Sequence, residues 1–131
     1  RRDDRGDRTD HAPHTAEQKS RGLAGSAMGI VGLECAFPLL YTIGEAGLLT
    51  LEQLVERMSM APRRIFGLGG GLQAGEPADL TVFDLDAEYE IDPETFLSKG
   101  RATPFAGWRV AGRTLWTLVG GRTAYATERF R

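Results

Sequence analysis

The chain has 131 residues, enough for one domain with its own core, and 41% hydrophobic and 26% charged residues are typical of a globular protein. The formal net charge of −2 argues against nucleic acid and anionic membranes as partners, and no apolar run is long enough to span a bilayer. A single cysteine excludes an internal disulfide and, with a charged N-terminus in place of a signal peptide, predicts a cytoplasmic protein.

The first eight residues of the chain are almost entirely charged. Seven of the eight carry a charge and Gly6 is the exception, so residues 1–8 cannot form a buried strand. We predict that this segment stands apart from the fold that follows it.

Residues 9–15 hold both histidines of the protein and most of its recognisable chemistry. Asp10, His11 and His14 are of the side-chain types that ligate zinc and move protons near neutral pH. Pro13 fixes its own φ and favours an extended conformation for the residue before it, which predicts a stiff supporting loop. Taken alone, however, the Asp-His-x-x-His spacing favours the simpler interpretation of an exposed polar loop.

Residues 16–29 are polar and contain glycine, which predicts a loop. Residues 30–43 carry a broad apolar face at helical spacing, and Pro38 should kink or break that helix. Cys35 lies in the same apolar pattern, so we expect a packed core thiol rather than a metal ligand or a nucleophile.

The next helix is specified by its own N-terminus. Thr50 and Gln53 form a capping-box pattern, and the apolar residues that follow at helical spacing predict a helix to about Met58. A second short helix should start near Pro62, which suits a first-turn position, and stop at Gly67.

After Gly67 the hydrophobic pattern changes to a period of two. Strands are predicted over residues 80–85 and 89–91. Residues 114–119 and 122–125 are predicted to form a hairpin, because the Gly-Gly pair between them can supply two positive-φ turn positions. The chain is therefore expected to divide at this point into a helical part and a small β module.

Several motifs resemble those of the dihydroorotases, the class I, zinc-dependent cyclic amidohydrolases of the amidohydrolase superfamily. The resemblance starts with Thr9-Asp10-His11-Ala12-Pro13-His14-Thr15 and covers roughly residues 9 to 126, in the family's order. The other matching motifs are Gly29-Ile30-Val31-Gly32-Leu33-Glu34, Ser59-Met60-Ala61-Pro62, Ile65-Phe66-Gly67-Leu68, Pro77-Ala78-Asp79-Leu80 and Thr103-Pro104-Phe105-Ala106-Gly107-Trp108.

The resemblance implies an α/β fold, in which the chain is the C-terminal fragment of a (β/α)8 TIM-like metallohydrolase barrel followed by part of a small β-sandwich. Residues 9–67 would be the end of the barrel, with its active-site loop and helices, and residues 68–131 would belong to the sandwich. Residues 1–8 stand where the family has a buried strand. A gene fragment or a reading-frame error explains them more simply than a solvated arm of independent use.

The resemblance also implies a reaction, the reversible zinc-dependent hydrolysis of (S)-dihydroorotate to N-carbamoyl-L-aspartate in de novo pyrimidine (UMP) biosynthesis. Asp10 matches the family's catalytic residue, which is both metal ligand and proton shuttle. His14 matches its substrate-binding histidine, and Met28 and Gly29 match the pair whose backbone touches substrate, although an aromatic residue is more usual than Met28. His11 is given no role beyond orienting the loop. We expect the four matched residues around one exposed, concave cavity.

The family's other zinc ligands and its upstream substrate-binding residues lie before Thr9 and do not occur in this sequence. An incomplete C-terminal portion of this kind is expected to lack activity, and to lose zinc, when it is alone. Two alternatives stay open: another cyclic amidohydrolase, such as a hydantoinase or allantoinase, or a non-catalytic dihydroorotase-like protein that assembles with aspartate carbamoyltransferase. The second histidine of the loop and Thr103-Pro104-Phe105 favour dihydroorotase. Besides the small-molecule substrate, a second copy of the chain is a partner that the resemblance leaves open.

Overall fold

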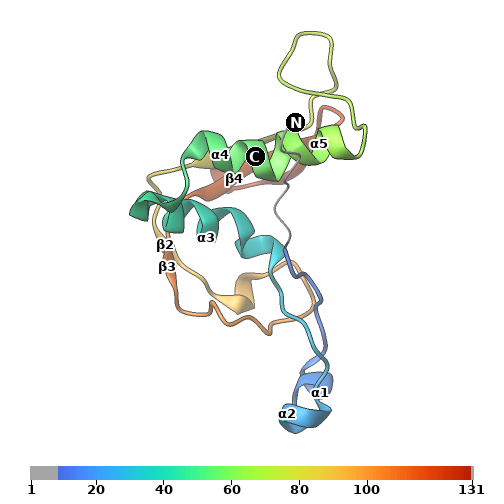
Figure 1. The fold of residues 1–131 in the computed structure, drawn as a ribbon, viewed down its shortest axis with the longest axis vertical. Helices are drawn as coiled ribbons and strands as arrows, with labels where there is room; N and C mark the ends of the chain where they lie inside the picture. Colours follow the sequence, from blue (N-terminus) through green and yellow to red (C-terminus); the bar gives the residue numbers. More distant parts are fainter. Residues whose placement is uncertain (1–8, 131) are drawn as a thin grey trace.

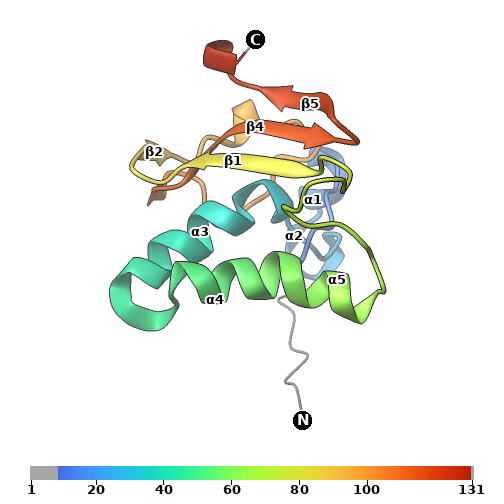
Figure 2. The same cartoon turned by 90° about the horizontal axis from the view of Figure 1, so that it is seen from above.

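A computed structural model describes residues 9–130 of the chain, and the charged segment predicted at residues 1–8 lies outside these described residues. A layer of helices covers one face of a small antiparallel sheet (Figure 1; Figure 2). None of the helices within residues 9–130 is both long enough and apolar enough to cross a membrane.

The helical part follows the loop of residues 9–15 and ends at residue 65. Its elements are α1 (Ala16–Lys19), α2 (Gly22–Gly25), the 3-10 turn η1 (Leu33–Cys35), α3 (Ala36–Ile43), the π turn η2 (Gly44–Leu48), α4 (Leu51–Val55), the π turn η3 (Glu56–Met60) and α5 (Ala61–Ile65). The loop predicted over residues 16–29 is therefore wrong in part, because it contains two single-turn helices. The first forms because Thr15 and Gln18 make a capping box, in which each side chain accepts from the other residue's backbone N–H.

The apolar helix starts later than predicted, and Pro38 does not interrupt it. Residues 30–32 are not helical, and the Val31 N–H donates to the carbonyl of Ala102 at 2.8 Å instead. Pro38 lies in the first turn of α3, where a backbone N–H has no intrahelical partner to lose, so the helix continues to Ile43.

The capping box at Thr50 is confirmed. The Thr50 hydroxyl accepts from the Gln53 N–H at 3.2 Å, and the Gln53 side chain accepts from the Thr50 N–H at 3.0 Å. The break predicted after Met58 is wrong, because α4, η3 and α5 form one continuous helical rod (Figure 2). A proline ring clashes with the carbonyl four residues earlier in a regular α-helix, and for Pro62 that carbonyl belongs to Met58, which lies in the wider π turn η3. Gly67, with a φ of 64°, follows the end of α5 as predicted.

The β part forms two small antiparallel sheets. The first has the order β1–β4–β5, and the second pairs β2 with β3. The strands are β1 (Leu80–Asp84), β2 (Tyr89–Glu90), β3 (Arg109–Val110), β4 (Arg113–Val119) and β5 (Arg122–Ala126), with 3-10 turns η4 (Pro93–Thr95) and η5 (Glu128–Phe130). The predicted hairpin is confirmed, since Val119 pairs with Arg122 across Gly120 and Gly121, whose φ angles are 55° and 76°.

The hydrophobic core joins the helical part to the β part. Its buried cluster consists of Cys35, Leu39, Ile91 and Val110. Beside it, Phe37 of α3 stacks on Phe83 of β1 with ring centroids 3.7 Å apart. The packed thiol predicted for Cys35 is confirmed, and its burial, with a smaller contribution from the neighbouring Glu34 carboxylate, raises the pKa of Cys35 above its ordinary value. A buried thiol of raised pKa is a poor nucleophile at neutral pH.

Candidate functional site

The site loop, residues 10–14, lies against a second segment, residues 27–32. The Ala12 N–H donates to the carbonyl of Ile30 at 2.8 Å, which joins the two segments through their backbones. On the other side of the loop, buried Gly100 leaves no space for a side chain, since a Cβ there would lie 2.8 Å from the Cβ of the loop's proline. The loop is therefore held between two backbone segments rather than projecting freely.

Two glycines in the second segment permit this close approach. A Cβ on Gly29 would lie 2.4 Å from the Cβ of Ala12, and the φ of Gly29 is 119°, which other residues rarely adopt. A Cβ on Gly32 would lie 2.4 Å from the carbonyl oxygen of Asp10. Glycine at these two positions thus allows the backbone of Asp10 and Ala12 to lie directly against the second segment.

His14 and Met28, predicted from the sequence as site residues, are in direct contact. The Nε2 atom of His14 lies 2.7 Å from the carbonyl oxygen of Met28. Because a carbonyl oxygen can only accept, Nε2 must carry the hydrogen, and Nδ1 is the ring atom left for another partner. The Met28 side chain is 86% exposed, so this contact is at the surface of the described part of the chain.

Asp10 and His11 are both exposed at the start of the loop. The contact of Asp10 with the second segment is made by its backbone carbonyl, which faces Gly32. The Nδ1 atom of His11 accepts from the Leu33 N–H at 3.2 Å. His11 thereby joins the loop to the start of η1, which agrees with the loop-orienting role expected for it.

Two charged residues that the sequence did not single out hold the backbone around the loop. The Lys19 ammonium donates to the carbonyl of Ala27 at 2.9 Å and also to that of Gly29. The Glu34 carboxylate accepts from two backbone N–H groups, those of residues 97–98, at 2.7 Å and 2.9 Å. The Lys19 contacts reach the same backbone that His14 contacts.

The described residues do not fit a catalytic zinc ion by themselves. Such a site needs about three protein ligands. Residues 9–130 contain no group of three His, Cys, Asp or Glu side chains placed to hold a metal ion. Asp10 offers one carboxylate, and the Nε2 atom of His14 is already bonded to Met28.

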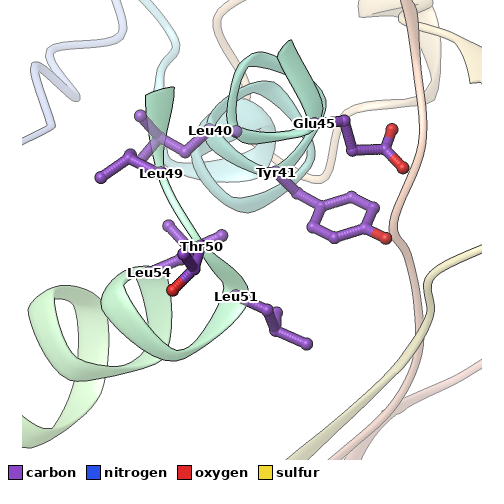
Figure 3. Close-up of a pocket in the computed structure, with 8 residues that line it drawn as sticks. Leu40, Tyr41, Glu45, Leu49, Thr50, Leu51 and Leu54 are labelled. Atoms are coloured by element: carbon purple, nitrogen blue, oxygen red, sulfur yellow. The ribbon is translucent and has the colours of Figure 1, made fainter. Parts of the chain in front are cut away.

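Two hollows in the described structure are lined by other residues. The smaller, of about 160 Å³, lies between α3 and α4, and Figure 3 shows it. The larger, of about 450 Å³, is lined in part by β4 and by the loop after β2. Because neither is lined by the loop histidines or by Asp10, Met28 or Gly29, the shared concave cavity stays a prediction.

Comparison with known proteins relates most of the described fold to one family. The model described as "Amidohydrolase family" matches residues 8–124. Proteins named dihydroorotase from Bacillus thuringiensis (strain Al Hakam) and Bacillus cereus (strain AH187) are each 52% identical to the chain over 122 residues. That match covers 92% of this chain but only 28% of each relative, so the chain spans little more than a quarter of their length.

Solved structures agree with this relationship. The L-hydantoinase (dihydropyrimidinase) from Arthrobacter aurescens is similar with a TM-score of 0.78 and 35% identity, over 88% of this chain and 27% of that protein. The D-hydantoinase (dihydropyrimidinase) from Thermus sp. gives the same TM-score and coverage at 28% identity. The mixed helix and sheet content is that of the predicted α/β class. With a family match over most of its length, the chain belongs to the amidohydrolase family.

Proposed function

We propose that the chain is the C-terminal portion of a dihydroorotase, which hydrolyses dihydroorotate reversibly to N-carbamoyl-aspartate. The observation that carries the proposal is the identity of 52% to proteins named dihydroorotase, over 92% of the chain. The hydantoinases are less similar, at 35% and 28% identity, which makes another cyclic amidohydrolase the second candidate.

In this proposal residues 9–67 are the end of a catalytic barrel and residues 68–131 are part of a β-sandwich. The strand pairings described after residue 67 are all antiparallel, as in a sandwich, whereas barrel strands of this fold are parallel. The described helices of residues 9–67 come without strands of their own. Zinc as the metal, a cytoplasmic location, a homodimer and assembly with aspartate carbamoyltransferase stay predictions.

Asp10 is the proposed proton-transfer residue. The ring opens when a water oxygen bonds to the carbonyl carbon, the ring C–N bond breaks and the nitrogen takes up a proton. A carboxylate placed beside both groups can take the proton from the water and deliver it to the nitrogen. The backbone carbonyl of Asp10 lies against Gly32 while its side chain is exposed, which supports this assignment. Asp10 would also be the one metal ligand that the described residues supply.

We assign substrate binding to His14 and to the backbone N–H groups of Met28 and Gly29. The Nδ1 atom of His14 is the ring atom open to a substrate, because Nε2 donates to Met28. The carbonyl groups of Met28 and Gly29 are bonded to His14 and Lys19, respectively. The backbone N–H groups of Met28 and Gly29 are therefore the donors left to bind substrate, and N–H donors suit the carboxylate and carbonyl oxygens of dihydroorotate.

The test is a hybrid enzyme, in which residues 9–130 replace the matching segment of the dihydroorotase from Bacillus thuringiensis. We expect it to open the dihydroorotate ring, because the host supplies the remaining metal ligands. The matched control inserts the corresponding segment of the Arthrobacter aurescens L-hydantoinase, which should not support this turnover. A folded hybrid that retains metal but is inactive would favour a non-catalytic relative. Faster hydrolysis of hydantoin or allantoin than of dihydroorotate would favour the second candidate.

Two substitutions at His14 should separate its anchoring role from its substrate role in the hybrid enzyme. In His14→Gln the side-chain nitrogen still reaches Met28, but no group replaces Nδ1, so KM for dihydroorotate should rise roughly 10-fold or more at an unchanged melting temperature. In His14→Asn the side chain is too short for the Met28 carbonyl, so the melting temperature should fall as well. Steady-state kinetics and thermal unfolding measure both effects. An unchanged KM in His14→Gln would contradict the substrate contact.

A further inference from the structure

Residues 15–26 leave the site loop, form α1 and α2, and return to the second segment. Figure 1 shows this excursion at the end of the molecule farthest from α4 and α5. It is closed at its base, where the Ala27 N–H donates to the carbonyl of Gln18 at 3.0 Å and the Ser26 hydroxyl donates to that of Lys19 at 2.7 Å. Lys19 therefore stands where the excursion meets the site, and its side chain is half-buried.

Three consecutive carbonyl groups of the returning segment are held by side chains. Lys19 binds those of Ala27 and Gly29, and His14 binds that of Met28 between them. An ammonium group donates several hydrogen bonds and accepts none, so one lysine can hold two carbonyl groups at once. Two side chains thus set the orientation of three successive peptide units beside the site loop.

The orientation of a carbonyl fixes that of the next N–H. A trans peptide unit is planar, so the Met28 N–H points away from the Ala27 carbonyl and hence away from Lys19. Among residues 9–130 no protein acceptor is bonded to this N–H. Binding of a cation to the carbonyl also polarises the peptide unit, which makes its N–H a stronger donor. The Met28 N–H is therefore an oriented donor next to His14 that has no acceptor among the described residues.

We propose that Lys19 is a positioning residue of this site, which directs the Met28 N–H toward a carboxylate or carbonyl oxygen of the substrate. Lys19 does not touch the substrate itself in this arrangement. The inference rests on the proposed function, because it takes the segment around Met28 as part of the substrate site. In this proposal the excursion of residues 15–26 places the Lys19 ammonium group against the carbonyl groups of that segment.

The first experiment needs no activity and uses the folded hybrid enzyme. Lys19→Met keeps a side chain of similar length but removes every hydrogen-bond donor, so the carbonyl ¹³C resonances of Ala27 and Gly29 should shift. In Lys19→Arg the same two resonances should stay near their original positions. The control is Arg21→Met, which removes a cation from the same excursion and, among the described residues, breaks only its exposed pair with Glu17 at 3.1 Å. Unchanged resonances in Lys19→Met would overturn the inference whatever the chain's activity.

The second experiment measures kinetics in the hybrid enzyme. We expect Lys19→Met to raise KM for dihydroorotate roughly 10- to 100-fold with a much smaller change in kcat, because a ground-state hydrogen bond is lost. Lys19→Arg should recover most of the affinity, and Arg21→Met should leave KM unchanged. A lower melting temperature with unchanged KM in Lys19→Met would show a merely structural lysine and overturn the inference while the proposed function stands. A hybrid with native Lys19 that is folded and retains metal but is inactive would instead refute the proposed function.

Discussion

Asp10→Asn is expected to lower kcat of the hybrid enzyme by about 10²- to 10⁴-fold, the range typical for the loss of a general acid–base group. An amide has nearly the same shape as a carboxylate but cannot take a proton from the attacking water. The fold should be unaffected, because the Asp10 side chain is exposed and its contact with Gly32 is made by the backbone carbonyl. The measurements are steady-state kinetics at saturating zinc and thermal unfolding.

The control for Asp10→Asn is Asp86→Asn, which removes an exposed carboxylate from a turn of the β part. It should leave kcat and KM unchanged. Metal content of both variants separates the two roles proposed for Asp10. A fall in kcat much larger than the fall in bound metal supports proton transfer, whereas a parallel fall of both would leave only the ligand role. Near-normal kcat in Asp10→Asn would remove Asp10 from the catalytic group.

The elements predicted well from the sequence are those whose geometry is set by neighbouring residues. The Thr50–Gln53 capping box and the Gly120-Gly121 turn each need only a few residues, so their patterns define them. The capping box at Thr15–Gln18 has the same chemistry but was missed. No apolar residues at helical spacing follow this capping box, and the single helical turn that it starts buries no side chain.

The elements predicted wrongly depend on structural features that a local hydrophobic period does not reveal. Val31 was placed in a helix, but its N–H is bonded to Ala102, a partner 71 positions away that no local period reveals. Pro62 was expected to follow a break, yet a π turn lets the helical rod continue through it. The register of β4 with β5 shifts between Thr117 and Leu118, where Ala124 has no partner in the pairing, and the alternating pattern of the two strands did not indicate this shift.

The candidate site shows the same division. The residue types of the loop and its non-helical course could be predicted from the sequence. The contact between His14 and Met28 could not, because it depends on how the intervening excursion folds back. Lys19 was missed for the same reason: nothing near it in the sequence indicates that its partners are the carbonyls of Ala27 and Gly29.

The 131-residue chain alone is expected to bind zinc at well below one ion per chain and to show no dihydroorotate turnover. Residues 9–130 offer no group of three metal-ligating side chains, and a catalytic zinc needs about three. Without a metal, the reaction loses the activated water and the electrostatic stabilisation of the developing oxyanion. The hybrid enzyme, in which a host supplies the other ligands, is the matched comparison.

Burial gives a second and independent reason for the same result. Apolar side chains are exposed along the rod of α4 to α5 and directly after it, including Leu51 at 37%, Val55 at 45% and Phe66 at 74% exposure. Exposed apolar side chains promote association, so the chain alone should aggregate or self-associate more readily than the hybrid. Zinc stoichiometry and the rate of dihydroorotate ring opening over a pH series test the argument from metal ligands. Light scattering of the same preparation tests the argument from burial. Near-stoichiometric zinc, with turnover that Asp10→Ala abolishes, would refute the expectation, because the missing ligands would then have to come from a second copy or from residues outside the described range.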